Sequence, residues 1–470
     1  MRLHEWKRLG FVLFLCASAN AQIFTKIADF GNEFGCCPQM SLVQGTDGRL
    51  YGTTGDGSFG GGTVFSLTMD GQLNLVYKFC SKQNCTDGSM PFAGVIVGSD
   101  GDLYGTTIEG GEYGYGTIYR VTRDGSLTTL YSFCKQTYCT DGSFPDGGLV
   151  QGHDGNIYGT TAGGGTYAAG TVFKITMAGD FTTLYSFCSQ GNPCLDGASP
   201  ASALTEGIDG NFYGATWSGG EFTSCCGTLF KITPSGTLTT IYDLSMLGLG
   251  HALAPLIPLD NGRFYGTLNP IKYLGGRIFS ITPTGDLKLL YSFCDNVPCL
   301  HGSNPTAPLE RGSDGTLYGT TVLGGQFDDG TIFQASRGKF TTLYSFCAEP
   351  SCADGVEPLG GLLQATNGMF YGTTYQGGSG SGTVYSLDMG LGPFVTFIRA
   401  AGRVGQTGGI LGQGFTGTTE VSLNGTPAKF TVISDTFIRA TVPPGAKTGY
   451  VTVTTPGGVL SSNVPFHVIR

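Results

Sequence analysis

Short runs of apolar residues, several of them alternating with polar residues, recur along most of the chain and are separated by turns that contain glycine. The clearest copy has four runs, at residues 93–98, 103–107, 117–122 and 127–133. Alternation with a period of two predicts β-strands with one buried face, and nothing between the runs has helical periodicity. Asp100-Gly101 and Asp124-Gly125 stand between successive runs, where a tight hairpin turn needs positive φ. The pattern therefore predicts four-stranded antiparallel units.

A tyrosine followed by glycine marks the second run of every unit. It occurs at Tyr51, Tyr104, Tyr158, Tyr213, Tyr265, Tyr318 and Tyr371, with spacings of 53, 54, 55, 52, 53 and 53 residues. Four strands within such a period are typical of a β-propeller blade. We expect each tyrosine to lie on the second strand of its blade and to pack against the neighbouring blade. The glycine after it, such as Gly105, would permit close backbone approach.

The two ends of the repeat region complement each other. The seventh unit reaches Gly390 to Pro393 without a fourth run, whereas residues 24–30 (FTKIADF) are similar to the fourth run at residues 127–133 (LTTLYSF). We predict that this N-terminal strand becomes the outer strand of the last blade and removes the open edges of the array. The fold class is then all-β, a seven-bladed propeller with four antiparallel strands per blade.

After Pro393 the period stops and no cysteine follows. Seven short β-rich runs with turn signals such as Asn424-Gly425 predict a small immunoglobulin-like β-sandwich. The predicted division is a signal peptide at residues 1–21, the propeller at 22–390, a linker at 391–393 and the sandwich at 394–470.

The N-terminal segment has the three parts of a secretory signal. Arg2, Lys7 and Arg8 precede the apolar residues 9–17, and Ala19-Asn20-Ala21 offers a small-residue cleavage site. We expect cleavage before Gln22; a buried N-terminal helix is the alternative. Cys16 suggests a lipoprotein signal, but Leu15 stands where a small residue is expected. The predicted location is outside the cell or on its surface.

Charge narrows the range of partners. The signal carries three of the 25 basic and one of the 34 acidic residues, so the mature chain would have 22 and 33, a net charge of −11. Nucleic acid and anionic membrane surfaces are unsuitable partners for this charge. No other segment approaches eighteen apolar residues, so we expect no transmembrane span after cleavage.

Cysteine usage indicates an oxidising compartment. Ten cysteines form close pairs at equivalent repeat positions: Cys80 with Cys85, Cys134 with Cys139, Cys188 with Cys194, Cys294 with Cys299 and Cys347 with Cys352. Each pair stands in its own repeat, which favours small disulfide loops over zinc sites built from converging pairs. The pairing of the adjacent cysteines Cys36, Cys37, Cys225 and Cys226 stays open.

The fourth and fifth repeats are irregular. The fourth contains Trp217 and lacks the cysteine loop after its last run, and in the fifth residues 269–273 replace the usual glycine-rich loop. A binding site grafted onto a regular scaffold would look like this, and so would drift in surface loops.

Candidate chemistry is sparse. His153, His251, His301 and His467 remain after signal removal without metal-ligand spacing, and no phosphate loop or nucleophile elbow is present. We therefore expect no catalytic residues, metal or cofactor. Asp87, Asp141, Asp196 and Asp354 each follow the second cysteine of a loop and precede glycine. They are weak candidates for binding a cation or a sugar hydroxyl at the channel mouth, and the alternative is that each caps its own turn.

The repeat resembles a known family. Tyr-Gly-Thr-Thr, then Gly-Gly, Gly-Thr-Val-Phe and Leu-Thr-Thr-Leu-Tyr-Ser-Phe, repeated over about residues 22 to 390, is similar to the Gloeo_Verruco (GloVer) tandem repeat of secreted bacterial proteins. The resemblance implies no activity. Residues 405–415, 421–425, 434–436, 440–443 and 449–453 resemble an IPT/TIG immunoglobulin-like domain, which in bacterial surface proteins implies a spacer or adhesive module.

Two classes of function follow. The favoured one is a non-enzymatic secreted or cell-surface binding or structural protein, a monomer whose propeller face recognises a polysaccharide or an extracellular protein. The alternative is an extracellular carbohydrate-active enzyme, a glycosidase or lyase, which would need two or three acidic residues converging in the channel. Near-uniform repeats favour the first, because an active site usually breaks symmetry.

Overall fold

The structure is a computed structural model that describes residues 22–55, 60–221, 226–247, 250–271, 275–295, 297–336 and 338–469; the predicted signal peptide lies outside them. The helical segments in these residues are short 3-10 turns: η1 (Asn32–Phe34), η2 (Gln83–Cys85), η3 (Thr137–Cys139), η4 (Leu244–Leu247) and η5 (Pro350–Cys352). Across the described residues, no helix is long and apolar enough to cross a membrane.

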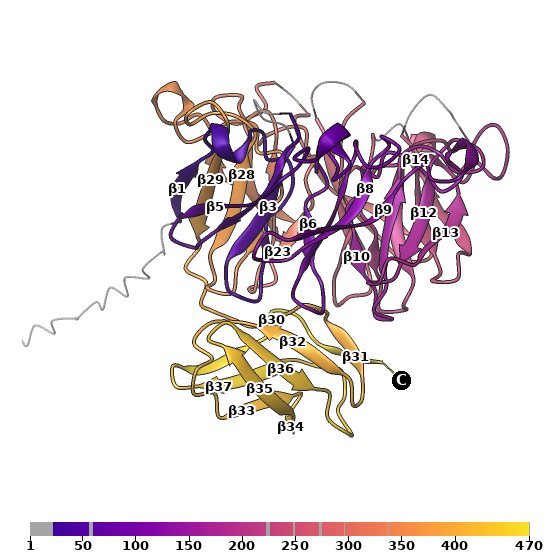
Figure 1. Cartoon of the computed structure of the whole chain (residues 1–470). Helices are drawn as coiled ribbons and strands as arrows, with labels where there is room; N and C mark the ends of the chain where they lie inside the picture. Colours follow the sequence, from indigo (N-terminus) through magenta and orange to yellow (C-terminus); the bar gives the residue numbers. More distant parts are fainter. Residues whose placement is uncertain are drawn as a thin grey trace, which may run out of the picture.

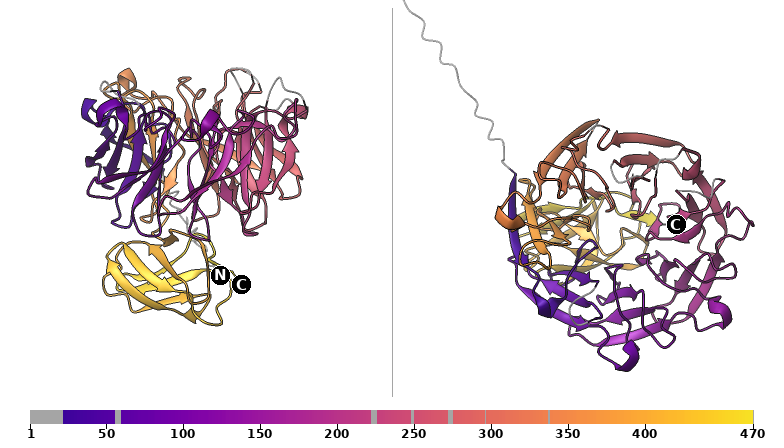
Figure 2. Two further views of the ribbon diagram at one scale, coloured as in Figure 1. Left: turned by 45° about the vertical axis from the view of Figure 1, so that its right-hand side comes forward. Right: turned by 90° about the horizontal axis from the view of Figure 1, so that it is seen from above.

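Antiparallel sheets arranged around a central axis make up the larger part of the molecule, called the ring here (Figure 1, Figure 2). Its first sheet contains β2 (Val43–Gln44), β3 (Leu50–Thr54), β4 (Thr63–Leu67) and β5 (Leu73–Lys78). The second contains β6 (Val95–Val97), β7 (Leu103–Thr107), β8 (Thr117–Val121) and β9 (Leu127–Ser132). The third contains β10 (Val150–Gln151), β11 (Ile157–Thr161), β12 (Thr171–Ile175) and β13 (Phe181–Ser186).

The remaining sheets of the ring repeat this order. The fourth contains β14 (Ala198–Pro200), β15 (Thr205–Glu206), β16 (Phe212–Ser218), β17 (Thr228–Ile232) and β18 (Leu238–Asp243). The fifth contains β19 (Ile257–Pro258), β20 (Phe264–Leu268), β21 (Arg277–Ile281) and β22 (Leu287–Ser292). The sixth contains β23 (Glu310–Arg311), β24 (Leu317–Thr321), β25 (Thr331–Ser336) and β26 (Lys339–Ser345). The last contains β27 (Leu363–Gln364), β28 (Phe370–Thr374), β29 (Thr383–Asp388) and β1 (Ile23–Asp29).

The N-terminal strand closes the ring, as predicted. β1 pairs antiparallel with β29 from Ile23 opposite Asp388 to Asp29 opposite Thr383. The Phe24 ring stacks on Tyr344 of β26 with centroids 3.8 Å apart, so β1 also packs against the sixth sheet. The predicted all-β, propeller-like fold is confirmed.

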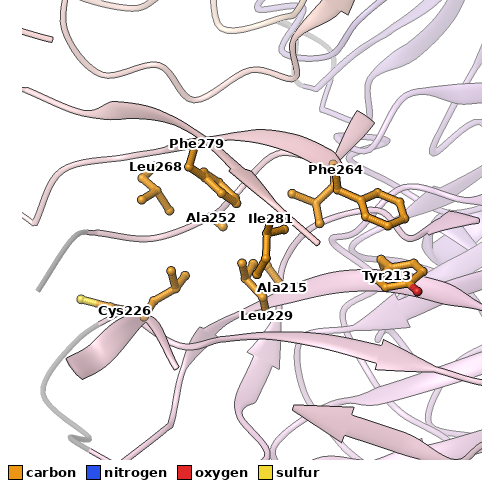
Figure 3. Close-up of a cluster of buried hydrophobic side chains, with 11 residues drawn as sticks. Tyr213, Ala215, Cys226, Leu229, Ala252, Phe264, Leu268, Phe279 and Ile281 are labelled. Atoms are coloured by element: carbon orange, nitrogen blue, oxygen red, sulfur yellow. The ribbon is translucent and has the colours of Figure 1, made fainter. Parts of the chain in front are cut away.

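The motif tyrosines hold neighbouring sheets together. Tyr213 of β16 packs against Phe264 of β20, with ring centroids 4.1 Å apart, inside a cluster that joins the fourth and fifth sheets (Figure 3). Tyr371 of the last sheet lies in one cluster with Leu50 and Phe65 of the first. A Cβ added to Gly105 would lie 2.4 Å from the Tyr119 hydroxyl oxygen, so the glycine after the tyrosine does permit close packing. Both expectations for this motif are confirmed.

Each motif tyrosine is also fixed at its hydroxyl. The Tyr104 hydroxyl donates to Asp100 Oδ2 at 2.7 Å, and the pairs at Tyr51, Tyr158, Tyr213 and Tyr318 repeat this contact with Asp47, Asp154, Asp209 and Asp314. At Tyr265 and Tyr371 the partner is the side-chain amide of Asn261 or Asn367, which donates instead. The hairpin turn between the first two strands of each sheet is thereby bonded to the second strand.

Strand alternation divides the connections between two faces of the ring. The turns before the second and fourth strands lie at one end of each sheet, for example residues 98–102 and 122–126. The loops after the second and fourth strands, which include the cysteine loops, lie at the other end. We call the first the sandwich face, because the C-terminal part packs beneath it, and the second the distal face (Figure 1).

The C-terminal part is a β-sandwich. One sheet contains β30 (Thr396–Phe397), β32 (Thr407–Leu411), β36 (Phe437–Thr441) and β35 (Lys429–Ser434); the other contains β34 (Thr426–Pro427), β33 (Glu420–Leu423), β37 (Val451–Thr455) and β38 (Gly458–Ser461). β31 (Ala401–Arg403) and β39 (His467–Ile469) pair in parallel. The core between the sheets includes Phe415, Ile438 and Val453.

Few direct contacts dock the sandwich. The Phe394 amide donates to the Thr366 carbonyl at 3.1 Å, and the Thr436 hydroxyl donates to the Thr46 carbonyl at 2.9 Å. Gly48 has φ +81°, and a Cβ there would lie 2.7 Å from Thr436 Cγ2. These contacts lie at the first and last sheets, to one side of the ring axis (Figure 2).

Candidate functional site

Exposed aromatic side chains gather on the distal face. Eight tyrosine, phenylalanine and tryptophan side chains of the described residues are exposed by at least 38%, and seven of them stand in distal loops or at the strand ends beside them: Tyr113, Tyr115, Tyr138, Phe144, Tyr167, Trp217 and Phe327. The eighth, Tyr450, belongs to the sandwich. Rings held in water are suited to stacking on a ligand and offer contact area at a small entropic cost.

Six residues just before proline form a repeated feature of this face. They stand five positions before the first buried leucine or valine of each sheet except the fifth, and we call them the pre-proline residues: Cys37, Met90, Phe144, Ser199, Asn304 and Glu357. Their φ angles lie between 52° and 68°. Each amide donates, at 2.8 to 3.2 Å, to a carbonyl of the preceding sheet in the ring, and the following proline is buried. The backbone of these positions is therefore clamped between two sheets.

The prolines explain a glycine of the repeat. A Cβ on Gly116, which has φ +97°, would lie 2.6 Å from Pro145 Cδ. Glycine is required there because the proline of the next segment occupies the space of a side chain. The glycine before each third strand and the proline before the next first strand thus form one latch between sheets.

The pre-proline side chains differ although their backbone does not. A residue other than glycine at positive φ costs on the order of 1 kcal/mol. Glycine would avoid that cost but loses more entropy on folding, so the backbone alone does not select one residue. Six different side chains occupy one conformation, and each is exposed or half-buried on the distal face. A face whose scaffold is constant and whose side chains vary is suited to recognition.

The irregular fourth and fifth sheets place a tryptophan platform on the same face. His251 stands at the position that is pre-proline elsewhere, and its ring stacks on the Trp217 indole with centroids 4.3 Å apart and an interplanar angle of 14°. His251 Nδ1 lies 2.9 Å from the Trp217 carbonyl oxygen, which accepts only, so Nδ1 carries the proton. Two contacts orient the indole, which stays 45% exposed.

The four candidate aspartates lie beneath this face, fully buried. Asp141 accepts hydrogen bonds from the Tyr131 hydroxyl at 2.8 Å and from the Lys135 and Gln136 amides at 2.9 and 3.2 Å. Asp87 and Asp354 have the equivalent partners, and Asp196 accepts from Tyr185 and Ser189. These are the bonds of a turn cap, so the oxygens are engaged within their own loops. A ligand-binding role for the four stays a prediction.

Disulfides close the same loops. The structure joins Cys80–Cys85, Cys134–Cys139, Cys188–Cys194, Cys294–Cys299 and Cys347–Cys352, the pairs read from the sequence. It also joins Cys36 to Cys37. Cys225 lies outside the described residues. Each loop is thus held by a covalent bond and, in four cases, by a buried carboxylate.

Metal chemistry finds little support among the described residues. One group of potential ligand atoms, from Asp329, Cys347 and Cys352, lies within 4.8 Å. Both sulfur atoms belong to a disulfide, so they cannot act as thiolate ligands. This cluster therefore has one ligand atom left.

Sequence reasoning missed the pre-proline residues. Their signal was present as an X-Pro dipeptide shortly after each cysteine loop, but a residue before proline is ordinarily extended. The Trp217–His251 stack was also missed, because its partners lie 34 residues apart in different sheets. Their membership in the irregular repeats was the only available signal.

The fold and this face define a tandem-repeat β-propeller-like protein with an immunoglobulin-like C-terminal module. The chain belongs to the Gloeobacter/Verrucomicrobia repeat family, whose model matches residues 56–272 and 254–419. An IPT/TIG domain model matches residues 393–468. Both resemblances read from the sequence are confirmed. No curated protein matches the chain.

Solved structures similar to the chain include hydrazine synthase from Kuenenia stuttgartiensis, at 14% identity and a TM-score of 0.48, covering 74% of this chain and 95% of that one. The propeller domain of the trilobed protease from Pyrococcus furiosus has 8% identity and a TM-score of 0.41, with 76% and 95% covered. An α-L-arabinanase from Penicillium chrysogenum has 11% identity and a TM-score of 0.39, with 78% and 98% covered.

Proposed function

We propose that the protein is a non-enzymatic extracellular binding protein whose distal face recognises a polysaccharide. In this proposal residues 1–21 are a cleaved signal peptide, residues 22–390 form the binding ring as seven blades, and residues 391–393 connect it to a spacer or adhesive module at 394–470. The observation that carries the proposal is the gathering of seven of the eight exposed aromatic side chains on one face.

The arrangement of these rings favours sugar units over a protein partner. A protein-binding patch is a contiguous apolar surface. Here the rings stand in separate loops rich in glycine and polar residues, for example Tyr113 and Tyr115 between Glu112, Gly114 and Gly116. Separate flat rings with hydrogen-bonding groups around them suit a polymer of pyranose units, which offers apolar ring faces and hydroxyl edges alternately.

The innermost distal positions speak against glycoside cleavage. Two residues after each pre-proline position, and after His251, the chain places Gln39, Phe92, Asp146, Ala201, Leu253, Thr306 and Leu359. Glycosidases use a pair of carboxyl groups at a defined separation. Only Asp146 of this set is acidic, which supports binding without hydrolysis.

The test uses affinity electrophoresis and a polysaccharide array with the secreted chain. We expect Trp217→Ala and the pair Tyr115→Ala with Phe144→Ala to weaken binding about tenfold or more, the loss of on the order of 1.4 kcal/mol per stacking ring. Tyr450→Ala is the control, since it removes an exposed tyrosine from the sandwich. Binding unchanged in the distal variants, capture of proteins but no polysaccharide, or release of reducing ends would each refute the proposal.

A further inference from the structure

A cleft lies between the sandwich face of the ring and the sandwich. Its larger part has a volume of about 520 Å³, within the range of small-molecule sites. The ring contributes His153, Glu206 and Phe212, and the sandwich contributes Arg403, Gln406 and Ile469. A smaller part, which shares His153, Glu206 and Ile469, extends towards Asp260, Arg311 and His467. The cleft is lined by both parts of the molecule and lies away from the distal face.

Charged residues on the ring side are variants of a repeated clamp between sheets. In three sheets a glutamine ending the first strand accepts a backbone amide of the preceding sheet: Gln44 from Thr366, Gln151 from Ser99 and Gln364 from Ser313. Glu206 stands at this position in the fourth sheet and accepts from the His153 amide at 3.0 Å and its Nδ1 at 2.7 Å. Arg311 in the sixth donates to both Asp260 oxygens at 3.0 and 2.7 Å.

The clamps occupy the acidic groups of the cleft. Glu206 is bonded to His153, and Asp260 is bidentate with Arg311. Asp154 accepts from the Tyr158 hydroxyl at 2.8 Å and from the Asn156 side-chain amide at 2.6 Å. The acidic acceptors here are therefore already matched with protein donors.

Two arginines of the sandwich are not matched in this way. The guanidinium groups of Arg399 and Arg403 have no hydrogen bond or ion pair to any residue that the structure describes. Arg399 is half-buried, its burial lowers its pKa, and the charges that act on it are those of Glu206 and Asp154. Arg403 lines the larger part of the cleft. Burying an arginine without a partner is unfavourable, and a planar oxyanion satisfies its forked donors best.

We propose that this cleft binds a small organic carboxylate with a ring-sized body, held at its carboxylate by Arg399 and Arg403. Phe212, Pro234 and Ile469 supply apolar wall for the body, and Gln406 supplies an amide for its polar edge. Uronic acids and aromatic acids share this chemistry. The site is separate from the polysaccharide face and does not depend on its existence.

The experiment is isothermal titration of the full mature chain with D-galacturonate and benzoate as probes, and with D-galactose as the uncharged control. We expect saturable binding of at least one carboxylate and none of galactose. Arg399→Gln and Arg403→Gln should each weaken binding about tenfold or more, the usual effect of losing a charge-assisted bidentate contact. Arg439→Gln, an exposed arginine on β36 outside the cleft lining, is the matched control and should bind as the unaltered chain does.

Each outcome decides the matter. Binding of galacturonate alone identifies an acidic sugar as the ligand class, and binding of benzoate alone identifies an aromatic acid. Absence of saturable binding for both probes overturns the proposal, as does equal binding by the two arginine variants. Arg403 is exposed, so its substitution tests the site even if Arg399→Gln fails to fold. Trp217→Ala should bind the carboxylate normally, which separates failure here from failure of the polysaccharide proposal.

Discussion

Two tyrosines of the second sheet should respond in opposite directions to the same substitution. Tyr104 and Tyr119 are both fully buried, and Tyr→Phe removes one hydroxyl from each. The Tyr104 hydroxyl donates to Asp100 at 2.7 Å, whereas the Tyr119 hydroxyl has no hydrogen-bond partner. Five equivalents of Tyr119, including Phe65 and Phe173, are already phenylalanine.

The magnitudes follow from these contacts. A hydrogen bond to a charged acceptor contributes about 1.5–3 kcal/mol, so Tyr104→Phe should lower the free energy of unfolding by about 2 kcal/mol, since water can reach the exposed Asp100. A buried hydroxyl without a partner costs about 1–3 kcal/mol, from which lost dispersion subtracts a few tenths. Tyr119→Phe should therefore raise the free energy of unfolding by about 1 kcal/mol.

Urea unfolding followed by tryptophan fluorescence measures both effects. A chain beginning at Gln22 has Trp217 as its one tryptophan, and it lies in β16 of the ring, so its emission reports on the ring. Tyr385→Phe, which removes a second hydroxyl without a partner, should behave as Tyr119→Phe does. Shifts of the same sign for Tyr104→Phe and Tyr119→Phe would show that the hydrogen-bond reasoning is wrong.

Two further predictions concern closure and docking. Deleting residues 22–30 removes β1 and exposes the edge of β29, so we expect a sharply lower melting temperature or aggregation, and an unchanged melting curve would refute closure by this strand. Burial lowers the pKa of His467 from its ordinary 6.5, with Asp260 acting against this and His153 with it. The folded state thus favours neutral His467; its contribution to stability is present above pH 6.5 and is lost as the pH falls through the lowered pKa. His467→Gln should flatten that loss in urea midpoints between about pH 7.5 and 5, and an identical pH dependence would refute it.

The ring was predictable because its determinants are local and repeated. The period of the Tyr-Gly motif defined the four-stranded unit, and the similarity of residues 24–30 to residues 127–133 identified the strand that closes it. The turn that contains Asp100 was read correctly as a hairpin, but its bond to Tyr104 was not inferred, although the two stand four residues apart. Positive φ before Pro145 was not predictable, because the latch to Gly116 that imposes it involves a different sheet. The cleft depends on how the sandwich docks, which no local pattern encodes.

The repeat separates what holds the ring together from what can vary. Tyr104, Gly105, Gly116 and their counterparts contact neighbouring sheets, so exchange there disturbs packing between sheets. A pre-proline side chain such as Phe144 starts from a backbone that is clamped by other residues, so its exchange leaves the latch intact. Different residues at such positions can therefore change what the distal face binds at little cost in stability. The fifth sheet departs furthest: it lacks the proline, His251 takes the equivalent position and orients Trp217, and we expect the strongest contribution to binding from this pair.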